Sequence, residues 1–252
     1  MTLLIAHRGY HKHSNLVENT IPAFQNAFDH GADGIEFDIH FTKDKKFIVY
    51  HDYTLDKIGV NKEIKDLTAS EILSYELAPG VKIPLLSEVL DRFGNKFFLN
   101  IEVKSKQSCG NELISLLKEK NILFSQSNLI LSSFHLERLL ELKEIDAKIP
   151  LGLLCTIIKD EISLVIENDF LAVHPYYDKA PKTFLRILEP LYHYFLNKKI
   201  KQAIKADIKL NCWTTNTPSY IQSALKKKFN AIITDEVEIA HILFTNNKNI
   251  KN

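Results

Sequence analysis

Short apolar runs alternate with longer amphipathic runs along almost all of this 252-residue chain, and this alternation is the feature that most restricts its fold. Most of the short runs are nearly continuously apolar, which is typical of strands buried on both faces of a parallel sheet. Strands separated by helices in this way predict either a (β/α)8 barrel or a doubly wound sheet. Nine strands are predicted: Leu3–His7, Gly34–Ile39, Phe47–His51, Phe97–Val103, Asn128–Ser132, Pro150–Leu154, Phe170–His174, Lys209–Trp213 and Ala231–Thr234.

The longer runs carry helical periodicity. In the first of them Ile21, Phe24 and Ala27 recur on one face, as an amphipathic helix requires. Pro190 should divide the long run that contains it into two helices, or kink it. The predicted helices are Thr20–His30, Leu85–Phe93, Asn111–Glu119, Leu136–Ile145, Lys182–Ala206 and Ser219–Lys227.

One pair of predicted strands cannot be parallel neighbours. Only seven residues separate Ile39 from Phe47, whereas a parallel crossover needs roughly a dozen. The segment from Phe37 to Asp52 is therefore predicted to be a β-hairpin. Without its return strand eight strands remain, the number of a TIM-type barrel. No glycine-rich phosphate loop follows the first strand, which disfavours the doubly wound nucleotide-binding alternative.

The segment 53–80 is more polar and interrupts the alternation. Thr68 and Glu71 form a capping-box pattern at the start of a short predicted helix. We therefore predict an α/β protein with a single TIM-type (β/α)8 barrel domain over residues 1–252. A β-hairpin should follow the second strand, and 53–80 should be a small insertion over one end of the barrel.

The composition excludes one large class of partner. The chain has 32 Lys and Arg against 31 Asp and Glu, a formal net charge of +1, whereas bulk binding of nucleic acid needs a strongly basic surface. The three cysteines are too few and too scattered for a disulfide framework and favour a reducing compartment. With no signal peptide and no apolar stretch of bilayer length, we expect a cytoplasmic protein without stable membrane association. The oligomeric state stays open.

Three carboxylates are predicted to face the barrel interior. Glu36 and Asp38 lie two residues apart on one strand, so their side chains share a face, and Glu102 lies near the end of another strand with Lys104 on its own face. Adjacent carboxylates in a confined space repel each other unless a cation or a proton lies between them. Oxygen ligands of this kind suit Mg²⁺ or Ca²⁺, so we predict a site for one divalent cation in preference to three ordinary ion pairs.

Two histidines and an arginine extend this predicted site. His7 and Arg8 end the first strand, where an arginine can bind phosphate oxygens and a histidine can transfer protons. If Asp44 and Lys45 form a two-residue hairpin turn, Asp38 pairs with His51, which places this histidine beside the predicted metal ligand. A slip of one residue would break this pairing.

These residues fall in motifs that closely resemble those of the glycerophosphodiester phosphodiesterase family. The matches occur in the family's order and span nearly the whole chain. They are HRG at 7–9, ENT at 18–20, AF at 23–24, GADGIEFDIHFTKD at 31–44, HD at 51–52, IPLLSEVL at 83–90, IEVK at 101–104, WTTN at 213–216 and IITD at 232–235.

The resemblance implies a TIM-type barrel that hydrolyses glycerophosphodiesters, such as glycerophosphocholine or glycerophosphoethanolamine, to glycerol 3-phosphate and an alcohol. It implies that Glu36, Asp38 and Glu102 are the metal ligands and that His7 and His51 are the general acid–base pair. It also implies phosphate-binding roles for Arg8 and Lys104. Segment 53–80 matches the insertion that family members carry after the HD motif. The attacking group, water or the glycerol 2-hydroxyl by way of a cyclic phosphate, stays open, as does the assignment of acid and base.

The sequence does not decide which residues line the substrate end of the pocket. Trp213 could line the pocket for the glycerol or head group, or pack in the core. His174, in an unusual VHPYY sequence at 173–177, is more simply a hydrogen-bonded structural residue than a residue of the barrel mouth. The 177–209 region is longer and richer in lysine than the family pattern. Alternatives are a lysophospholipase D or a phosphatidylinositol phospholipase C-like enzyme on the same barrel, a non-catalytic binding module, and a metal hydrolase of another barrel family.

Overall fold

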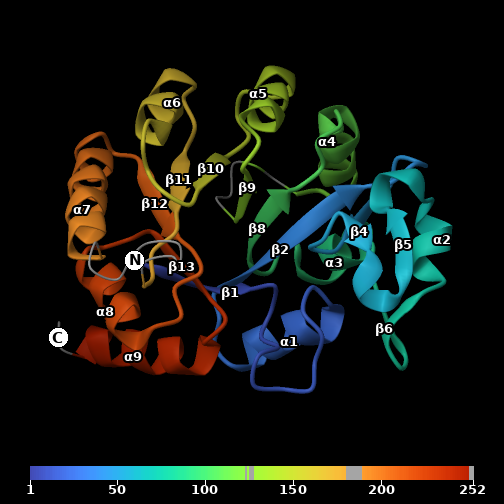
Figure 1. The fold of residues 1–252 in the computed structure, drawn as a ribbon, viewed down its shortest axis with the longest axis horizontal. Coiled ribbons are helices and arrows are strands. Elements are labelled where there is room, and N and C mark those ends of the chain that lie inside the picture. The colour runs from blue at the N-terminus through green and yellow to red at the C-terminus, as the bar shows by residue number, and fades with distance from the viewer. Residues whose placement is uncertain (123, 125–127, 180–188, 250–252) are drawn as a thin grey trace.

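In the computed structural model, which describes residues 1–122, 124, 128–179 and 189–249, parallel strands close into a barrel of eight (Figure 1). The ladder is continuous around the ring, because β1 pairs with β13 on one side and with β2 on the other. This confirms the predicted TIM-type fold. The strands of the ring are β1 (Leu3–His7), β2 (Gly34–Phe41), β8 (Phe98–Val103), β9 (Leu129–Ser133), β10 (Leu151–Cys155), β11 (Ala172–Pro175), β12 (Lys209–Cys212) and β13 (Ala231–Thr234).

Helices surround the ring and bury their apolar faces against the outer faces of the strands (Figure 1). Phe24 of α1, for example, packs against Phe37 of β2 with their ring centroids 5.4 Å apart. Burial of aromatic and aliphatic side chains in this layer is the main source of the fold's stability. The helices are α1 (Ile21–Asp29), α3 (Leu86–Phe93), α4 (Gly110–Glu119), α5 (Leu136–Ile145), α6 (Glu161–Glu167), α7 (Glu189–Lys205), α8 (Pro218–Lys226) and α9 (Val237–Asn249).

Pro190 does not interrupt the helix that the structure describes. It lies in the first turn of α7, where its missing N–H leaves no intrahelical hydrogen bond unmade. The predicted helical residues from Lys182 to Leu188 lie outside the described residues. The helix α6 was not predicted from the sequence. It has only seven residues and buries only Ile162 and Val165, so its apolar periodicity is too short to recognise.

The predicted hairpin exists, but its predicted register is wrong by one residue. β3 (Phe47–Val49) runs antiparallel to β2 with Ile39 opposite Val49, and the N–H of Tyr50 donates to the carbonyl oxygen of Asp38. Asp38 therefore pairs with Tyr50 and not with His51. The cause is the turn, which has three residues instead of two, because Lys45 takes a left-handed conformation with φ of 60°.

The insertion forms a small layer beside the barrel (Figure 1). It buries Leu55, Ile64, Leu67 and Ile72 in a second apolar cluster against Ile48 of the hairpin. Its elements are β4 (Thr54–Leu55), the 3-10 turn η1 (Asp56–Ile58), β5 (Val60–Glu63), the turn η2 (Ile64–Asp66), α2 (Ala69–Leu73), β6 (Glu76–Ala78) and β7 (Val81–Lys82). The predicted capping box at Thr68 is present. The single-domain interpretation of residues 1–252 stays a prediction.

The barrel interior is divided between an apolar part and a polar part. Ile5, Ala231 and Ile233 pack with Leu3 and Phe98, and three of these five residues open their strands. Polar side chains follow toward the carboxyl ends, which is the end where TIM barrels build their sites. None of the helices that the structure describes is long and apolar enough to cross a membrane.

Candidate active site

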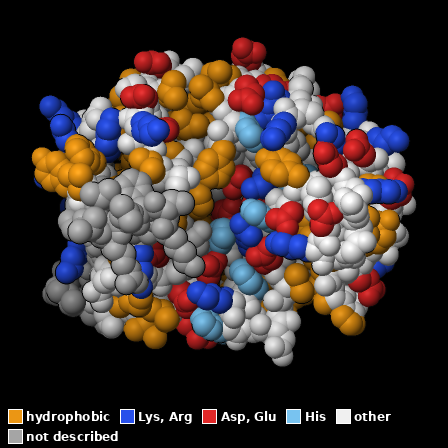
Figure 2. Space-filling model, in the orientation of Figure 1, with side chains coloured by type: hydrophobic (Ala, Val, Ile, Leu, Met, Phe, Trp, Pro, Cys, Tyr) orange, Lys and Arg blue, Asp and Glu red, His pale blue; other side chains and the backbone are white. Residues whose placement is uncertain are grey.

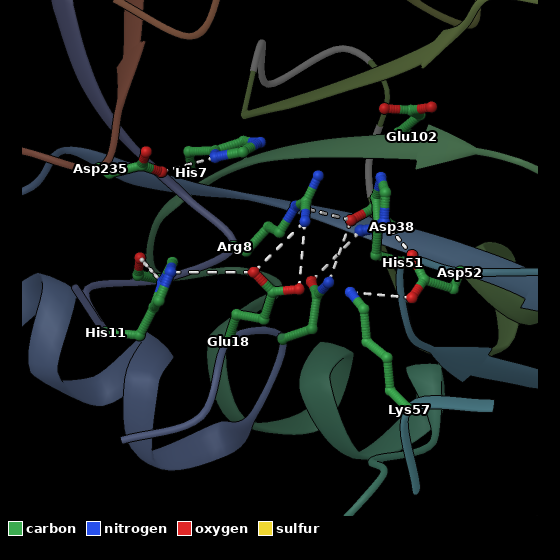
Figure 3. A network of polar contacts seen from close by, with 12 residues as sticks. His7, Arg8, His11, Glu18, Asp38, His51, Asp52, Lys57, Glu102 and Asp235 are labelled. Carbon is green, nitrogen blue, oxygen red and sulfur yellow. Dashed lines mark hydrogen bonds and ion pairs between the residues drawn. The ribbon is translucent and has the colours of Figure 1, made fainter. Parts of the chain in front are cut away.

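Seven of the eight predicted site residues meet at the carboxyl end of the barrel, and they come from neighbouring strands. His7 ends β1, Glu36 and Asp38 lie on β2, and Glu102 lies near the end of β8. Histidine, acidic and basic side chains line the hollow at the centre of this face (Figure 2). The close view shows how the histidines and the carboxylates surround one small volume (Figure 3).

The three carboxylates form a candidate cation site. One oxygen from each of Glu36, Asp38 and Glu102 lies within 4.8 Å of the others. Burial and the charge of Asp38 raise the pKa of Glu36 to about 8 and that of Glu102 to about 7. In the absence of a cation these two carboxyl groups therefore keep their protons to a higher pH than an ordinary glutamate does, because negative charges at close range repel.

Asp38 is the charged member of the group. Burial alone would raise its pKa, but the charges of Arg8 and Lys104 lower it. Arg8 Nε lies 3.2 Å from Asp38 Oδ2 and Lys104 Nζ lies 3.5 Å from Oδ1. Oδ1 is nevertheless buried without a hydrogen-bond partner in the part of the chain that the structure describes. A buried carboxylate oxygen without a donor, beside two more carboxylates, fits a hard divalent cation.

Arg8 is fixed by the loop that follows β1. Its Nη1 donates to Glu18 Oε1 at 3.1 Å, and its carbonyl oxygen accepts the N–H of Asn19. Asn19 also donates through Nδ2 to Asp38 Oδ2 at 3.0 Å. Arg8 and Asn19 both take left-handed φ values, 54° and 57°. Such conformations persist only where the surroundings enforce them, so Glu18 and Asn19 act here as positioning residues for Arg8 and Asp38.

His7 is held by a carboxylate from the other end of the chain. Its Nδ1 donates to Asp235 Oδ1 at 2.6 Å, and its Nε2 lies 3.9 Å from Glu36 Oε2. Asn216 donates to the second oxygen of Asp235 at 2.6 Å. Burial lowers the pKa of His7, but the hydrogen bond to Asp235 and the charge of Glu36 outweigh burial and raise it. Asp235 has its pKa lowered to about 2, since the bond to His7 outweighs its burial.

His51 is held in the same manner. Its Nδ1 donates to Asp52 Oδ1 at 2.6 Å, and Lys57 Nζ lies 2.8 Å from the other oxygen of Asp52 (Figure 3). Burial lowers the pKa of His51, and the charge of Asp38 only partly opposes this. His51 thus faces Asp38 although the hairpin register differs from the predicted one. Both histidines expose Nε2 to the site because an aspartate binds Nδ1.

The last two predicted residues differ in where they lie. Lys104 donates to Glu102 Oε1 at 3.1 Å and so belongs to the polar network of the site, whereas Trp213 does not. Trp213 follows β12 and packs on the interior apolar cluster, with its ring 5.3 Å from Phe134 and 6.0 Å from Tyr176. Its role as a substrate contact stays a prediction.

His174 lies inside the barrel and not at its mouth. Its Nε2 accepts a hydrogen bond from Asn211 Nδ2 at 3.0 Å, and burial lowers its pKa to about 3. A Cβ atom at Gly152 would lie 2.3 Å from this Nε2. The neutral ring therefore fills space that only a glycine on β10 leaves free, which favours the structural role over a role at the barrel mouth.

Comparison with known proteins agrees with this arrangement. The model of the glycerophosphoryl diester phosphodiesterase family matches residues 7–239. A glycerophosphodiester phosphodiesterase of Caldanaerobacter subterraneus subsp. tengcongensis is 33% identical over 253 residues, which cover 94% of this chain and 95% of that protein. The crystal structure of a glycerophosphodiester phosphodiesterase from Parabacteroides distasonis superposes with a TM-score of 0.80 at 23% identity, covering 98% of both chains. A phosphodiesterase of Oleispira antarctica, solved with its product sn-glycerol-3-phosphate, has a TM-score of 0.79 at 18% identity and covers 97% of each chain. Because both solved structures are less than 25% identical to this chain, they show that the fold is shared and no more.

Proposed function

Because the chain belongs to the glycerophosphoryl diester phosphodiesterase family, we propose that it hydrolyses glycerophosphodiesters such as glycerophosphocholine and glycerophosphoethanolamine at this site. The products are glycerol 3-phosphate and the free alcohol. The observation that carries the proposal is the approach of Glu36, Asp38 and Glu102 to within 4.8 Å, between two histidines that each have an aspartate on Nδ1.

A divalent cation, Mg²⁺ or Ca²⁺, is the proposed cofactor, with Glu36, Asp38 and Glu102 as its ligands. When bound, it would offset the negative charge of the phosphodiester and of the transition state. Arg8 and Lys104 are the proposed phosphate ligands of the chain itself. Both side chains are mostly buried and both already lie near Asp38, so their charges are fixed in a poorly solvated place where electrostatic stabilisation is strong.

The two histidines are the proposed acid and base. His7, whose pKa is raised, is the better proton donor near neutral pH, and His51, whose pKa is lowered, is the better acceptor. His51 removes the proton of the attacking hydroxyl group as the new P–O bond forms. The P–O bond to the alcohol breaks, and His7 Nε2 gives its proton to the departing alkoxide. Attack by water gives glycerol 3-phosphate directly. Attack by the glycerol 2-hydroxyl gives a cyclic phosphate, which water then opens as the P–O bond to the 2-oxygen breaks and that oxygen takes up a proton.

The test is release of glycerol 3-phosphate from glycerophosphocholine, with a chelator and then with added Mg²⁺ or Ca²⁺. We expect release only with the cation. His7→Ala and His51→Ala should each reduce turnover by about 10²–10⁴-fold while the barrel stays folded, the range for loss of a general acid or base. Glu36→Ala should also reduce turnover strongly, because it removes a proposed cation ligand. Glu63→Ala, which removes an exposed carboxylate paired with Lys65, is the matched control. Near-normal activity of a metal-checked Glu36→Ala protein, or no release from any glycerophosphodiester, would refute the proposal.

A further inference from the structure

The helix α7 exposes an apolar surface that the fold does not use. Leu191, Tyr194 and Phe195 are 51%, 64% and 55% exposed. Their spacing of three and four residues places them on one face of the helix. Single exposed apolar side chains are ordinary on a protein surface, but three neighbours on successive turns are the mark of an interaction site.

The opposite face of α7 anchors the helix to the barrel. Leu196, Ile200 and Ala203 are nearly completely buried in the main core. The inner face therefore anchors α7, whereas Leu191, Tyr194 and Phe195 each leave more than half of their surface exposed.

Lysines continue the exposed face toward the end of the helix. Lys198, Lys201 and Lys205 are exposed and have no ion pair or hydrogen bond within the described residues. Helical geometry at about 3.6 residues per turn puts them in line with Leu191 and Tyr194. The only acidic residue of α7 is Glu189. Hydrophobic side chains gather over α7 at the left of Figure 2, with basic side chains close to them.

The apolar turns lie toward the same end of the barrel as the active site. Only residues 206–208 separate α7 from the start of β12, so Lys205 lies near the amino end of the strands. The helix has 17 residues and is about 25 Å long. Its first turns therefore reach back toward the carboxyl ends, where His7 and Asp38 lie.

We propose that α7 is a peripheral docking surface for an anionic phospholipid bilayer. Leu191 and Phe195 enter the head-group boundary, Tyr194 lies at it, and the three lysines contact lipid phosphates. A second copy of the chain that docks through the same face is a poorer occupant, because this face has no acidic side chain to pair with the three lysines. The inference concerns a surface apart from the catalytic residues and does not depend on the proposed reaction.

The test is co-sedimentation with vesicles of phosphatidylcholine alone and of phosphatidylcholine mixed with phosphatidylglycerol. We expect binding to the mixed vesicles that weakens at high salt. Lys198→Gln, Lys201→Gln and Lys205→Gln combined should lower the partition coefficient by about a hundredfold. Leu191→Ser with Phe195→Ser should also lower it. Hydrolysis of soluble glycerophosphocholine should not change in either variant. Loss of vesicle binding can therefore be distinguished from loss of catalysis.

Matched controls use similar residues elsewhere on the surface. Lys62→Gln, Lys82→Gln and Lys96→Gln remove three other exposed lysines, and Ile239→Ser with Ile242→Ser removes two exposed apolar side chains of α9. These proteins should bind mixed vesicles like the parent. The proposal is overturned if the parent does not bind mixed vesicles, or if the controls lose as much binding as the α7 variants. It is equally overturned if sedimentation velocity finds a dimer that Phe195→Ser dissociates.

Discussion

At the scale of single residues, the two histidines of the site have similar aspartate partners but differ in proton affinity. Asp235 holds His7 and raises its pKa. At His51, burial and the charges of Arg8 and Lys104 lower the pKa, and the charge of Asp38 and the bond to Asp52 only partly oppose them. The two rings therefore differ in proton affinity although their contacts are alike. This difference is what a reaction with one acid and one base requires.

Asp235→Asn should lower the pKa of His7, because the amide removes the charge that favours the imidazolium. The alkaline limb of the kcat/KM profile, which reports loss of the proton from His7, should then move to lower pH. We expect turnover to fall by less than the roughly 10²–10⁴-fold that removal of a general acid costs, since the ring remains. The measurement is a pH–rate profile at fixed cation concentration.

Asp52→Asn is the matched comparison. It should lower the pKa of His51 and so move the acidic limb to lower pH, leaving the alkaline limb in place. An Asp235→Asn protein whose turnover falls while its alkaline limb stays unchanged would show that Asp235 only supports the structure.

The carboxylate group could be predicted from sequence and the His7–Asp235 pair could not. Strand alternation alone places Glu36 and Asp38 on one face. Asp235 ends the IITD motif at 232–235, but it lies 228 residues from His7, and nothing in either motif indicates that the two residues pair. Only closure of the ring between β13 and β1 brings them together.

At the scale of elements, the hairpin shows that the conformation of a turn sets the register of the two strands that it joins. Strand parity predicted which residues of β2 face inward, but the register of β3 depends on whether one residue takes a left-handed conformation. Lys45 does so with φ of 60°, and a lysine gives no sequence signal for this, since glycine or asparagine is the usual residue there. His51 still reaches Asp38 because it lies beyond the end of β3 and is not bound by the ladder.

Lys45→Gly should stabilise the protein by about 1 kcal/mol. Glycine takes a left-handed conformation without the steric cost that other residues incur, and part of this gain is offset by its freedom in the unfolded chain. The lost ion pair with Glu112 is exposed and contributes little. Chemical denaturation with an unchanged m value is the measurement. Lys46→Gly, next to it in a conformation open to any residue, should instead destabilise; equal effects of the two substitutions would contradict the turn assignment.

At the scale of the whole molecule, the barrel follows from the number of buried strands, and the site follows from the barrel. Eight apolar runs predicted the ring although α6 and α9 were not predicted, because missing helices do not change the strand count. In a closed parallel ring the carboxyl ends of all strands meet at one mouth. Residues of β1, β2 and β8 thus share one volume there, so a ligand that binds them in the folded state would stabilise the ring.

This coupling predicts how stability depends on pH. The pKa of Glu36 rises from 4.5 to about 8 on folding and that of Glu102 to about 7. Well below pH 4.5 these groups are protonated in both states. Between about 5 and 8 the unfolded chain releases protons that the folded chain keeps, so the stability of the cation-free protein should fall as pH rises. Asp38, with a lowered pKa, titrates below this range.

A divalent cation should reverse the trend, because it binds the ionised carboxylates and stabilises the folded state that holds them. The increase in Tm on adding saturating Mg²⁺ or Ca²⁺ should therefore grow from about pH 5 to about pH 8. Glu36→Gln, which keeps the shape of the side chain but cannot ionise, should show a smaller increase and a flatter pH dependence. Thermal unfolding with chelator and with cation, at a series of pH values, measures both. An increase in Tm that is the same at every pH, or the same in Glu36→Gln, would mean that the cation binds elsewhere.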